Sequence, residues 1–180
     1  MGVIDRAFSR DSAGIPYLRG SALKGKLRWG ALRWARTLDD NKAVSCSPEN
    51  GQACSASPCP FCRLFGSARL QGAVRFSDAY PDEDFTEWFR STAEASPSLF
   101  PGVPASIRYN NGISRKYLRS EPDHLFSTET LPALRFSSDL HGSLDPQQTD
   151  LLKQSAAILT YFGSGSSRGL GFCSYRLETL

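Results

Sequence analysis

Apolar residues recur at three- and four-residue steps shortly after the start of the chain, which is typical of an amphipathic helix. The apolar stripe would consist of Leu23, Leu27, Ala31 and Trp34. Gly14, Pro16 and Gly20 come before it and favour a turn, and Ser21 is the predicted N-cap. The pattern therefore predicts a helix from Ser21 to Arg36.

The rest of the chain alternates between short strand patterns and helix patterns. Strands are predicted at residues 73–79, 105–109, 131–140 and 171–178, a short helix at 85–94, and a tight turn at Asn110-Asn111-Gly112. Asp145-Pro146 is predicted to start a second long helix, because proline is favoured in the first helical turn. This mixture predicts a single α+β domain over residues 1–180.

Composition narrows the class of protein only slightly. The chain has 180 residues, 40% of them apolar, which is enough to bury a core. The net charge of +3 is too small to indicate nucleic-acid binding by itself, so that argument must rest on local clusters. No apolar run reaches the length of a membrane span, and the first residues lack a signal-peptide core. We expect a cytoplasmic protein that contacts no membrane.

The first turn of the long helix carries Lys24 and Lys26 and no acid. Cations oppose the helix dipole at this end, unless an anion lies nearby. Free N–H groups, the Ser21 hydroxyl and two lysines together favour a phosphate site. A solvated amphipathic helix with unfavourably placed charges is the alternative.

Four of the five cysteines lie close together in a loop rich in proline, glycine and serine. They are Cys46, Cys54, Cys59 and Cys62, with the spacing C-x7-C-x4-C-x2-C. A loop so poor in apolar residues cannot hold itself by packing, whereas four thiolates on one Zn²⁺ would hold it. The pattern predicts a structural zinc site, with free thiols, a disulfide pair or an iron–sulfur cluster as alternatives. Cys173 is expected to be a buried structural thiol.

Two further segments have chemistry suited to a polyanion. Arg115, Lys116 and Arg119 surround Tyr117, a mixture that suits a phosphate backbone with a base packed on the ring. The glycine loop at residues 163–171 carries Arg168 and could bring N–H groups close to a phosphate. An ordinary exposed hairpin is the alternative for the first segment.

Five motifs, in order, resemble the RAMP superfamily of CRISPR interference complexes. They are GIPYLRGSALKGKLR, RLFG, a strand that ends in SDA, LFSTET and GSGSSRGLG. The likeness covers nearly the whole chain and is greatest to the backbone subunits of type III RNA-guided complexes. Some members of that group carry a zinc finger just ahead of the Leu-Phe-Gly motif.

The resemblance implies a ferredoxin-like, RRM-like βαββαβ core within one RAMP domain. The zinc-finger insertion would cover residues 45–63, and a protruding thumb hairpin would cover about 110–128. The family core starts with a strand some two dozen residues before the position of Asp5, and only four residues precede it here. We therefore expect the first core strand to be missing, through a fragment, a mistaken start or donation by another chain, and the chain to be unstable alone.

The resemblance also implies residue roles. Guide CRISPR RNA would be contacted by Gly20, Ser21, Lys24, Lys26, Arg28, Arg115, Lys116, Arg119, Gly165, Arg168 and Gly169. Catalytic backbone subunits cut target RNA with an aspartate before the Gly-Ser motif, and Asp5 is the match here. It would bind Mg²⁺ or Mn²⁺, or orient the attacking 2′-OH. Other RAMP subunits of the complex would be its protein partners.

Three other functions stay open at this point. The chain could be a guide-binding subunit without cleavage, or a zinc-stapled protein-interaction domain outside RNA biology. A guide-processing endonuclease is the third, and its histidine would have to be His124 or His141.

Overall fold

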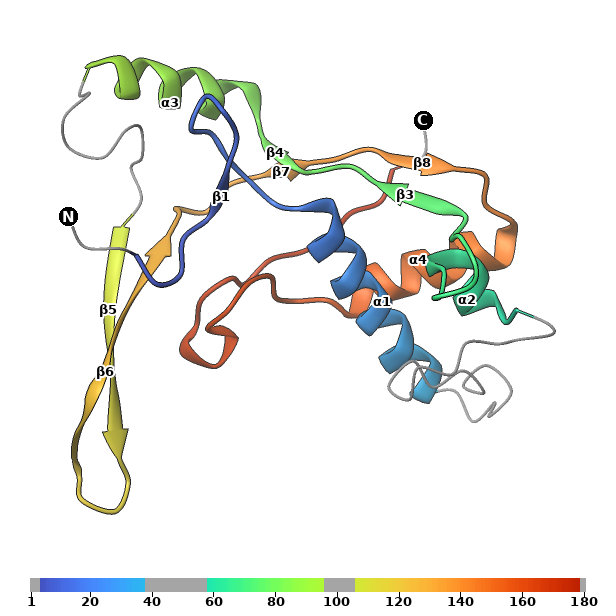
Figure 1. The fold of residues 1–180 in the computed structure, drawn as a ribbon. Coiled ribbons are helices and arrows are strands. Elements are labelled where there is room, and N and C mark those ends of the chain that lie inside the picture. The colour runs from blue at the N-terminus through green and yellow to red at the C-terminus, as the bar shows by residue number, and fades with distance from the viewer. Residues whose placement is uncertain (1–3, 38–57, 96–105, 179–180) are drawn as a thin grey trace. The chain divides into compact units, whose positions relative to one another are not determined.

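The computed structural model describes residues 4–37, 58–95 and 106–178 (Figure 1). The chain folds as two compact units. One comprises residues 20–77 and 139–180, and we call it the helical unit. The other comprises residues 1–19 and 78–138, and we call it the hairpin unit. Each is described by itself.

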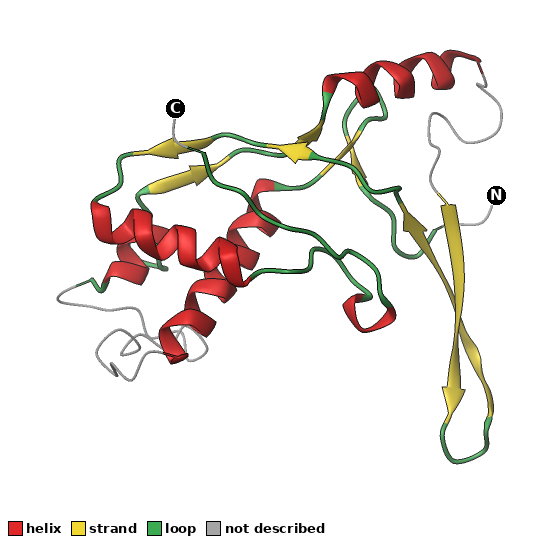
Figure 2. Cartoon of the chain, turned by 180° about the vertical axis from the view of Figure 1, so that it is seen from behind, coloured by secondary structure: helices red, strands yellow, loops and turns green. Residues whose placement is uncertain are grey.

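The helical unit places its helices on one side of a short antiparallel ladder (Figures 1 and 2). Its elements are α1 (Gly20–Thr37), α2 (Pro60–Phe65), β3 (Val74–Phe76), β8 (Leu140–Gly142) and α4 (Pro146–Ile158). Val74 pairs with Gly142, Arg75 with His141 and Phe76 with Leu140. The order α1, β3, β8, α4 corresponds to the middle of the expected βαββαβ core, whose complete order stays a prediction.

An apolar core joins the three helices to β3. It consists of Leu27, Ala31, Phe61, Cys62, Leu64, Phe65, Val74, Leu152, Ala156 and Leu159. Helices α1 and α4 approach closely at Gly30, where an added Cβ would lie 2.6 Å from the Ser155 carbonyl oxygen. The buried Ser155 hydroxyl donates to the carbonyl of Leu27, so the crossing is held by a hydrogen bond as well as by packing.

The start of α4 agrees with the sequence prediction. Asp145 accepts a hydrogen bond from the backbone N–H of Gln148, and the Gln148 side chain accepts one from the N–H of Asp145. This reciprocal pair is a capping box, and Pro146 occupies the first turn. For α1 the prediction was wrong in detail, because the helix already includes Gly20 and Ser21 therefore lies inside it.

The hairpin unit is built from short ladders and one long two-stranded arm. Its elements are β1 (Ser9–Arg10), β2 (Pro16–Tyr17), β4 (Tyr80–Pro81), α3 (Glu83–Ala95), β5 (Ser106–Ser114), β6 (Arg119–Thr130) and β7 (Phe136–Ser137). β1 pairs with β2, β4 with β7 and β5 with β6, all antiparallel. Tyr17 and Tyr80 stack at 5.5 Å between ring centroids, beside the bridge of Leu18 to Ala79.

The β5–β6 hairpin corresponds to the predicted thumb, but its turn lies elsewhere. Asn110-Asn111-Gly112 stays within β5, and the chain reverses at residues 115–118. The register shifts between Asn111 and Ile113, where an added Cβ on Gly112 would contact His124. The Asn-Asn-Gly signal therefore marks an irregularity in the ladder instead of the reversal.

Three predicted strands are shorter than expected, and the first of them, at 73–79, yields only β3. The alternating pattern at 131–140 yields only β7 and the first residue of β8. Residues 171–178 contain only one described bridge, between Phe172 and Tyr161, although Tyr175 and Leu177 still pack against the core. In residues 171–178 the alternating side chains pack against the core on one side of the segment. The described residues form no strand ladder there.

None of the helices within the described ranges is long and apolar enough to cross a membrane.

Candidate nucleic-acid interface

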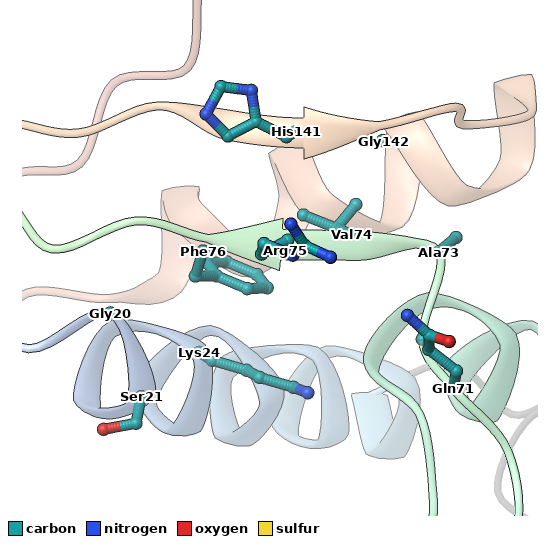
Figure 3. A pocket seen from close by; sticks show the side chains of 11 residues that line it. Gly20, Ser21, Lys24, Gln71, Ala73, Val74, Arg75, Phe76, His141 and Gly142 are labelled. Carbon is teal, nitrogen blue, oxygen red and sulfur yellow. The ribbon is translucent and has the colours of Figure 1, made fainter.

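A cavity of about 590 Å³ opens beside the first turn of α1 (Figure 3). It is lined by Gly20, Ser21 and Lys24 of α1, by Gln71, Gly72, Ala73, Val74, Arg75 and Phe76, and by His141 and Gly142 of β8. This lining includes two permanent cations and a histidine, and no carboxylate. Its electrostatics favour an anion, because the N-terminal end of α1 adds a positive partial charge.

Gly20 is required here by a close approach of two backbones. A Cβ at this position would lie 2.4 Å from the carbonyl oxygen of Phe76 and 2.7 Å from that of Ser77. The glycine thus brings the first turn of α1 against the end of β3. This packing sets the first turn of α1 beside Arg75, a residue that the sequence analysis did not single out.

The cations predicted on α1 do not act as one group. Lys24 and Arg28 are four positions apart and share a helix face, whereas Lys26 lies close enough to Cys173 to affect its thiol. Arg28 packs its guanidinium 5.2 Å from the centroid of the Phe61 ring. Only Lys24 of the three lines the cavity.

Cys173 behaves largely as predicted for a structural thiol. Burial raises the pKa of its thiol, although the Tyr175 side chain and Lys26 oppose that rise. The thiol is half-buried and is therefore kept in its neutral form near pH 7.

The glycine loop closes on itself. Arg168 and Leu170 donate their N–H groups to the carbonyl of Gly165, and Gly169 donates to Ser166. Gly165 and Gly169 have φ of +89° and +73° and flank the short 3-10 helix Ser166–Arg168. These N–H groups are used inside the loop, so a bound anion would have to meet other donors. No residue of this loop lines the cavity beside α1.

The turn of the β5–β6 hairpin concentrates cations around one ring. Lys116 Nζ lies 5.0 Å and the Arg119 guanidinium 5.3 Å from the centroid of Tyr117. All three side chains are exposed, as are Arg115 and Leu118. The basic, aromatic segment therefore lies at the exposed turn of the hairpin, and its binding of RNA stays a prediction.

Asp5 lies against β6 and is held there by Ser127. Its Oδ2 accepts hydrogen bonds from the Ser127 N–H at 2.7 Å and from the Ser127 hydroxyl at 2.9 Å. Its own N–H donates to the Ser127 Oγ at 3.1 Å. The Ser127 backbone N–H, followed by the hydroxyl, lowers the pKa of the Asp5 carboxyl below its ordinary value. Asp5 is thus an exposed, ionised carboxylate.

The residues around Asp5 run beside β6 as a third strand-like segment. Arg6 donates its N–H to the carbonyl of Ser127, and Glu129 donates to the carbonyl of Arg6, in a parallel bridge. Ser127 is also the register partner of Tyr109 on β5. Tyr109, Ser127 and Asp5 therefore follow one another across three strands, and the Tyr109 side chain is 71% exposed. Sequence analysis missed Ser127, although it lies within the LFSTET motif.

Of the four cysteines predicted to bind zinc, only Cys59 and Cys62 lie within the described residues. Cys59 is the N-cap of α2, and its Sγ accepts a hydrogen bond of 3.5 Å from the N–H of Cys62. An N–H group directed at sulfur favours the thiolate form that binds metals, whereas Cys62 is buried in the apolar core. Cys46 and Cys54 lie outside the described residues. His124 contacts the carbonyl oxygen of Pro122 through Nδ1, whereas His141 lines the cavity.

Comparison with known proteins supplies the family. No curated protein matches the chain. A solved structure that does match is a chain of the type III-B Cmr-beta complex bound to cognate target RNA, with 13% sequence identity and a TM-score of 0.56. The match covers 91% of this chain and 85% of the other, so the two share a fold. The sequence itself matches the RAMP superfamily over residues 2–174, and the chain therefore belongs to that superfamily.

Proposed function

We propose that this protein is an RNA-binding backbone subunit of a type III CRISPR effector complex and that it also cuts bound target RNA through Asp5. The fold it shares with a chain of a type III-B complex supports the assembly, and membership of the RAMP superfamily supports the class of subunit. Its partners would be the guide CRISPR RNA, the target RNA and neighbouring RAMP subunits in the cytoplasm.

The observation that carries RNA binding is the cavity beside α1. Lys24 and Arg75 approach it from a helix and a strand, and no carboxylate lines it. A phosphate there would meet both cations and the positive end of α1. Lys26, Arg28, the glycine loop and the hairpin turn would contact other parts of the guide. A chain of such contacts would hold a backbone without reading its sequence.

Target cleavage would use the exposed carboxylate of Asp5. One Asp5 oxygen accepts both Ser127 hydrogen bonds, which leaves the other for a hard cation or for the substrate 2′-OH. Mg²⁺ or Mn²⁺ at this carboxylate would supply charge stabilisation for the phosphate under attack. Alternatively, Asp5 itself would orient the 2′-OH for in-line attack on the adjacent phosphate, in which the 2′-oxygen gives up its proton to water, its bond to phosphorus forms, and the 5′-oxygen departs and takes up a proton from water.

A second candidate is a guide-binding subunit that does not cut. One feature favours it: Asp5 already serves a structural purpose by holding the first residues against β6. In addition, Asp5 belongs to no group of three potential metal ligands among the residues with described positions. In this case the polyanion site alone would explain the protein.

A guide-loaded complex incubated with complementary RNA and Mg²⁺ tests these proposals. We expect Asp5→Ala to abolish the cuts while guide content stays unchanged. Asp150→Ala, which removes an exposed carboxylate from α4, serves as the matched control and should cut normally. Unaffected cuts in Asp5→Ala leave the non-catalytic subunit as the function.

RNA retention is measured separately. Lys24→Ala combined with Arg75→Ala should lower the guide RNA recovered with the complex, and the difference from the original protein should shrink as salt rises, because the variant releases fewer counterions on binding. If the purified assembly carries no RNA at all, a zinc-stapled protein-interaction domain replaces both candidates.

We also propose a structural Zn²⁺ bound by Cys46, Cys54, Cys59 and Cys62. Its support is the spacing of the four thiols and the position of Cys59 and Cys62 at the start of α2. One zinc per chain is expected by elemental analysis. Cys59→Ser should lose it, and Cys173→Ser should keep it. Equal zinc content in both variants would contradict the assignment.

A further inference from the structure

Ser127 is the residue that determines where the Asp5 carboxylate points. It is 8% exposed and lies in the interior of β6. Its hydroxyl both accepts from the Asp5 N–H and donates to Asp5 Oδ2, while its own N–H donates to the same oxygen. Three hydrogen bonds between two residues fix the main chain and the side chain of Asp5 together.

We infer that Ser127 is a positioning residue for target cleavage, which holds Asp5 Oδ2 so that the second carboxylate oxygen faces the substrate. This inference rests on the proposed function, because it assigns a task to a partner of Asp5. Among the described residues no hydrogen bond to Oδ1 is found, and Asp5 is exposed. A carboxylate anchored through one oxygen presents the other in a fixed direction.

Independent contacts hold the surrounding backbone in place. The Arg6 N–H donates to the carbonyl of Ser127, and the Glu129 N–H donates to the carbonyl of Arg6. The Glu129 carboxylate accepts from the Phe8 N–H at 2.8 Å and from the Arg10 guanidinium. Loss of the Ser127 hydroxyl should therefore loosen the Asp5 side chain, which would keep only the Ser127 N–H as a partner, without detaching the segment that carries it.

The position on the sheet explains why a serine suits this task. Side chains alternate along a strand, so Ser127 and Glu129 share one face of β6, and Phe126 and Thr128 the other. Arg6 packs its guanidinium 4.8 Å from the Phe126 ring, on that opposite face. Asp5 is thus on the Ser127 face, where a hydroxyl is short enough to reach a carboxylate across neighbouring strands.

The hydrogen bonds also favour the ionised carboxylate. Both Ser127 donors lower the pKa of Asp5, in agreement with a group that must be charged to orient a hydroxyl or a cation.

The test compares Ser127→Ala, Ser127→Thr and Thr130→Ala in the guide-loaded complex. Thr130 is the matched control, because its hydroxyl donates to the Ser106 carbonyl, away from Asp5. We expect Ser127→Ala to lower the cleavage rate at saturating target about tenfold, as for loss of one hydrogen bond to a charged group. Target affinity and guide content should not change. Ser127→Thr, which keeps a hydroxyl, should cut at the original rate, and Thr130→Ala should not alter that rate.

The outcomes separate this inference from the proposed function. Normal cuts in Asp5→Ala overturn both. Abolished cuts in Asp5→Ala with a normal rate in Ser127→Ala overturn the inference alone. Lost guide RNA in Ser127→Ala, or faster hydrogen exchange at the Glu129 amide, would assign Ser127 a merely structural role and also overturn it.

Discussion

Two regions of the molecule, the core of the helical unit and the base of the β5–β6 hairpin, are stabilised by different kinds of contact. Among the described residues, the core of the helical unit is a cluster of ten buried apolar side chains around α1, α2 and α4. At the base of the β5–β6 hairpin, by contrast, Ser127, Thr128 and Glu129 are the buried residues. Burial is non-directional in the first case, whereas in the second each buried polar group needs a specific partner.

Because of this difference, we expect the two regions to tolerate side-chain substitutions differently. An apolar core accepts a change of side chain that keeps its volume, but a polar cluster loses a hydrogen bond with almost any change. The polar base also fixes directions, since the Ser127 N–H donates to Asp5 Oδ2, and Arg10 and the Phe8 N–H donate to the Glu129 carboxylate. We therefore expect stability to depend mainly on the helical unit and orientation on the hairpin base.

Glycines in α1 provide the strongest test of the core. A Cβ at Gly30 would lie 2.6 Å from the Ser155 carbonyl oxygen, whereas nothing lies within 4 Å of one at Gly25. Gly30→Ala should force α1 and α4 apart and destabilise the protein by about 2–3 kcal/mol. Gly25→Ala should stabilise it by up to about 1 kcal/mol, because alanine favours the helix. Denaturant unfolding of both variants measures the contrast, and equal effects would contradict the packing.

The second test concerns the buried carboxylate of the hairpin base. Glu129 is nearly inaccessible and accepts from Arg10 and from the Phe8 N–H. Glu129→Gln should cost about 2 kcal/mol locally, as expected for a lost charged hydrogen bond. Hydrogen exchange at the amides of Phe8 and Arg6 should accelerate, while amides in α4 keep their protection.

Glu121 supplies the control for that variant. It lies on β6 as well, but it is exposed. Glu121→Gln should therefore leave exchange and stability within about 0.5 kcal/mol of the original. An equal effect of the two substitutions would mean that net charge, not the ion pair, matters.

Periodicity predicted the helices of the helical unit well, but its strand at 171–178 and the hairpin base poorly. Leu27 and Ala31 recur at helical spacing, and Asp145-Pro146 marks a helix start, because both signals depend on neighbours in sequence. The contact of Asp5 with Ser127 joins residues 122 positions apart, and no local pattern records it. Likewise, Arg75 was missed because its role depends on Gly20 bringing α1 against β3.

Substitutions at the turn of the hairpin test whether an exposed aromatic residue contributes to RNA binding without contributing to stability. Tyr117 is exposed and contacts mainly Lys116 and Arg119. Tyr117→Ala should change unfolding free energy by less than about 0.5 kcal/mol. It should weaken RNA binding roughly fivefold, since stacking of a base on an aromatic ring contributes about 1 kcal/mol or more. Tyr117→Phe, which keeps the ring, should bind normally, and weakened binding in that variant would exclude stacking.

The smallest effect concerns pH and the charge of Asp5. Ser127 lowers the pKa of Asp5 below 3.8, so the ionised form stabilises the folded hairpin base above that pH. This contribution is lost as the pH falls through the lowered pKa in the folded protein. Asp5→Asn removes the charge at every pH, and should therefore differ from the original protein at pH 7 but converge with it in acid. Exchange at the Ser127 amide, corrected for intrinsic rates, measures the difference. If the two proteins differ equally at both pH values, the hydrogen bonds to Asp5 do not depend on its charge.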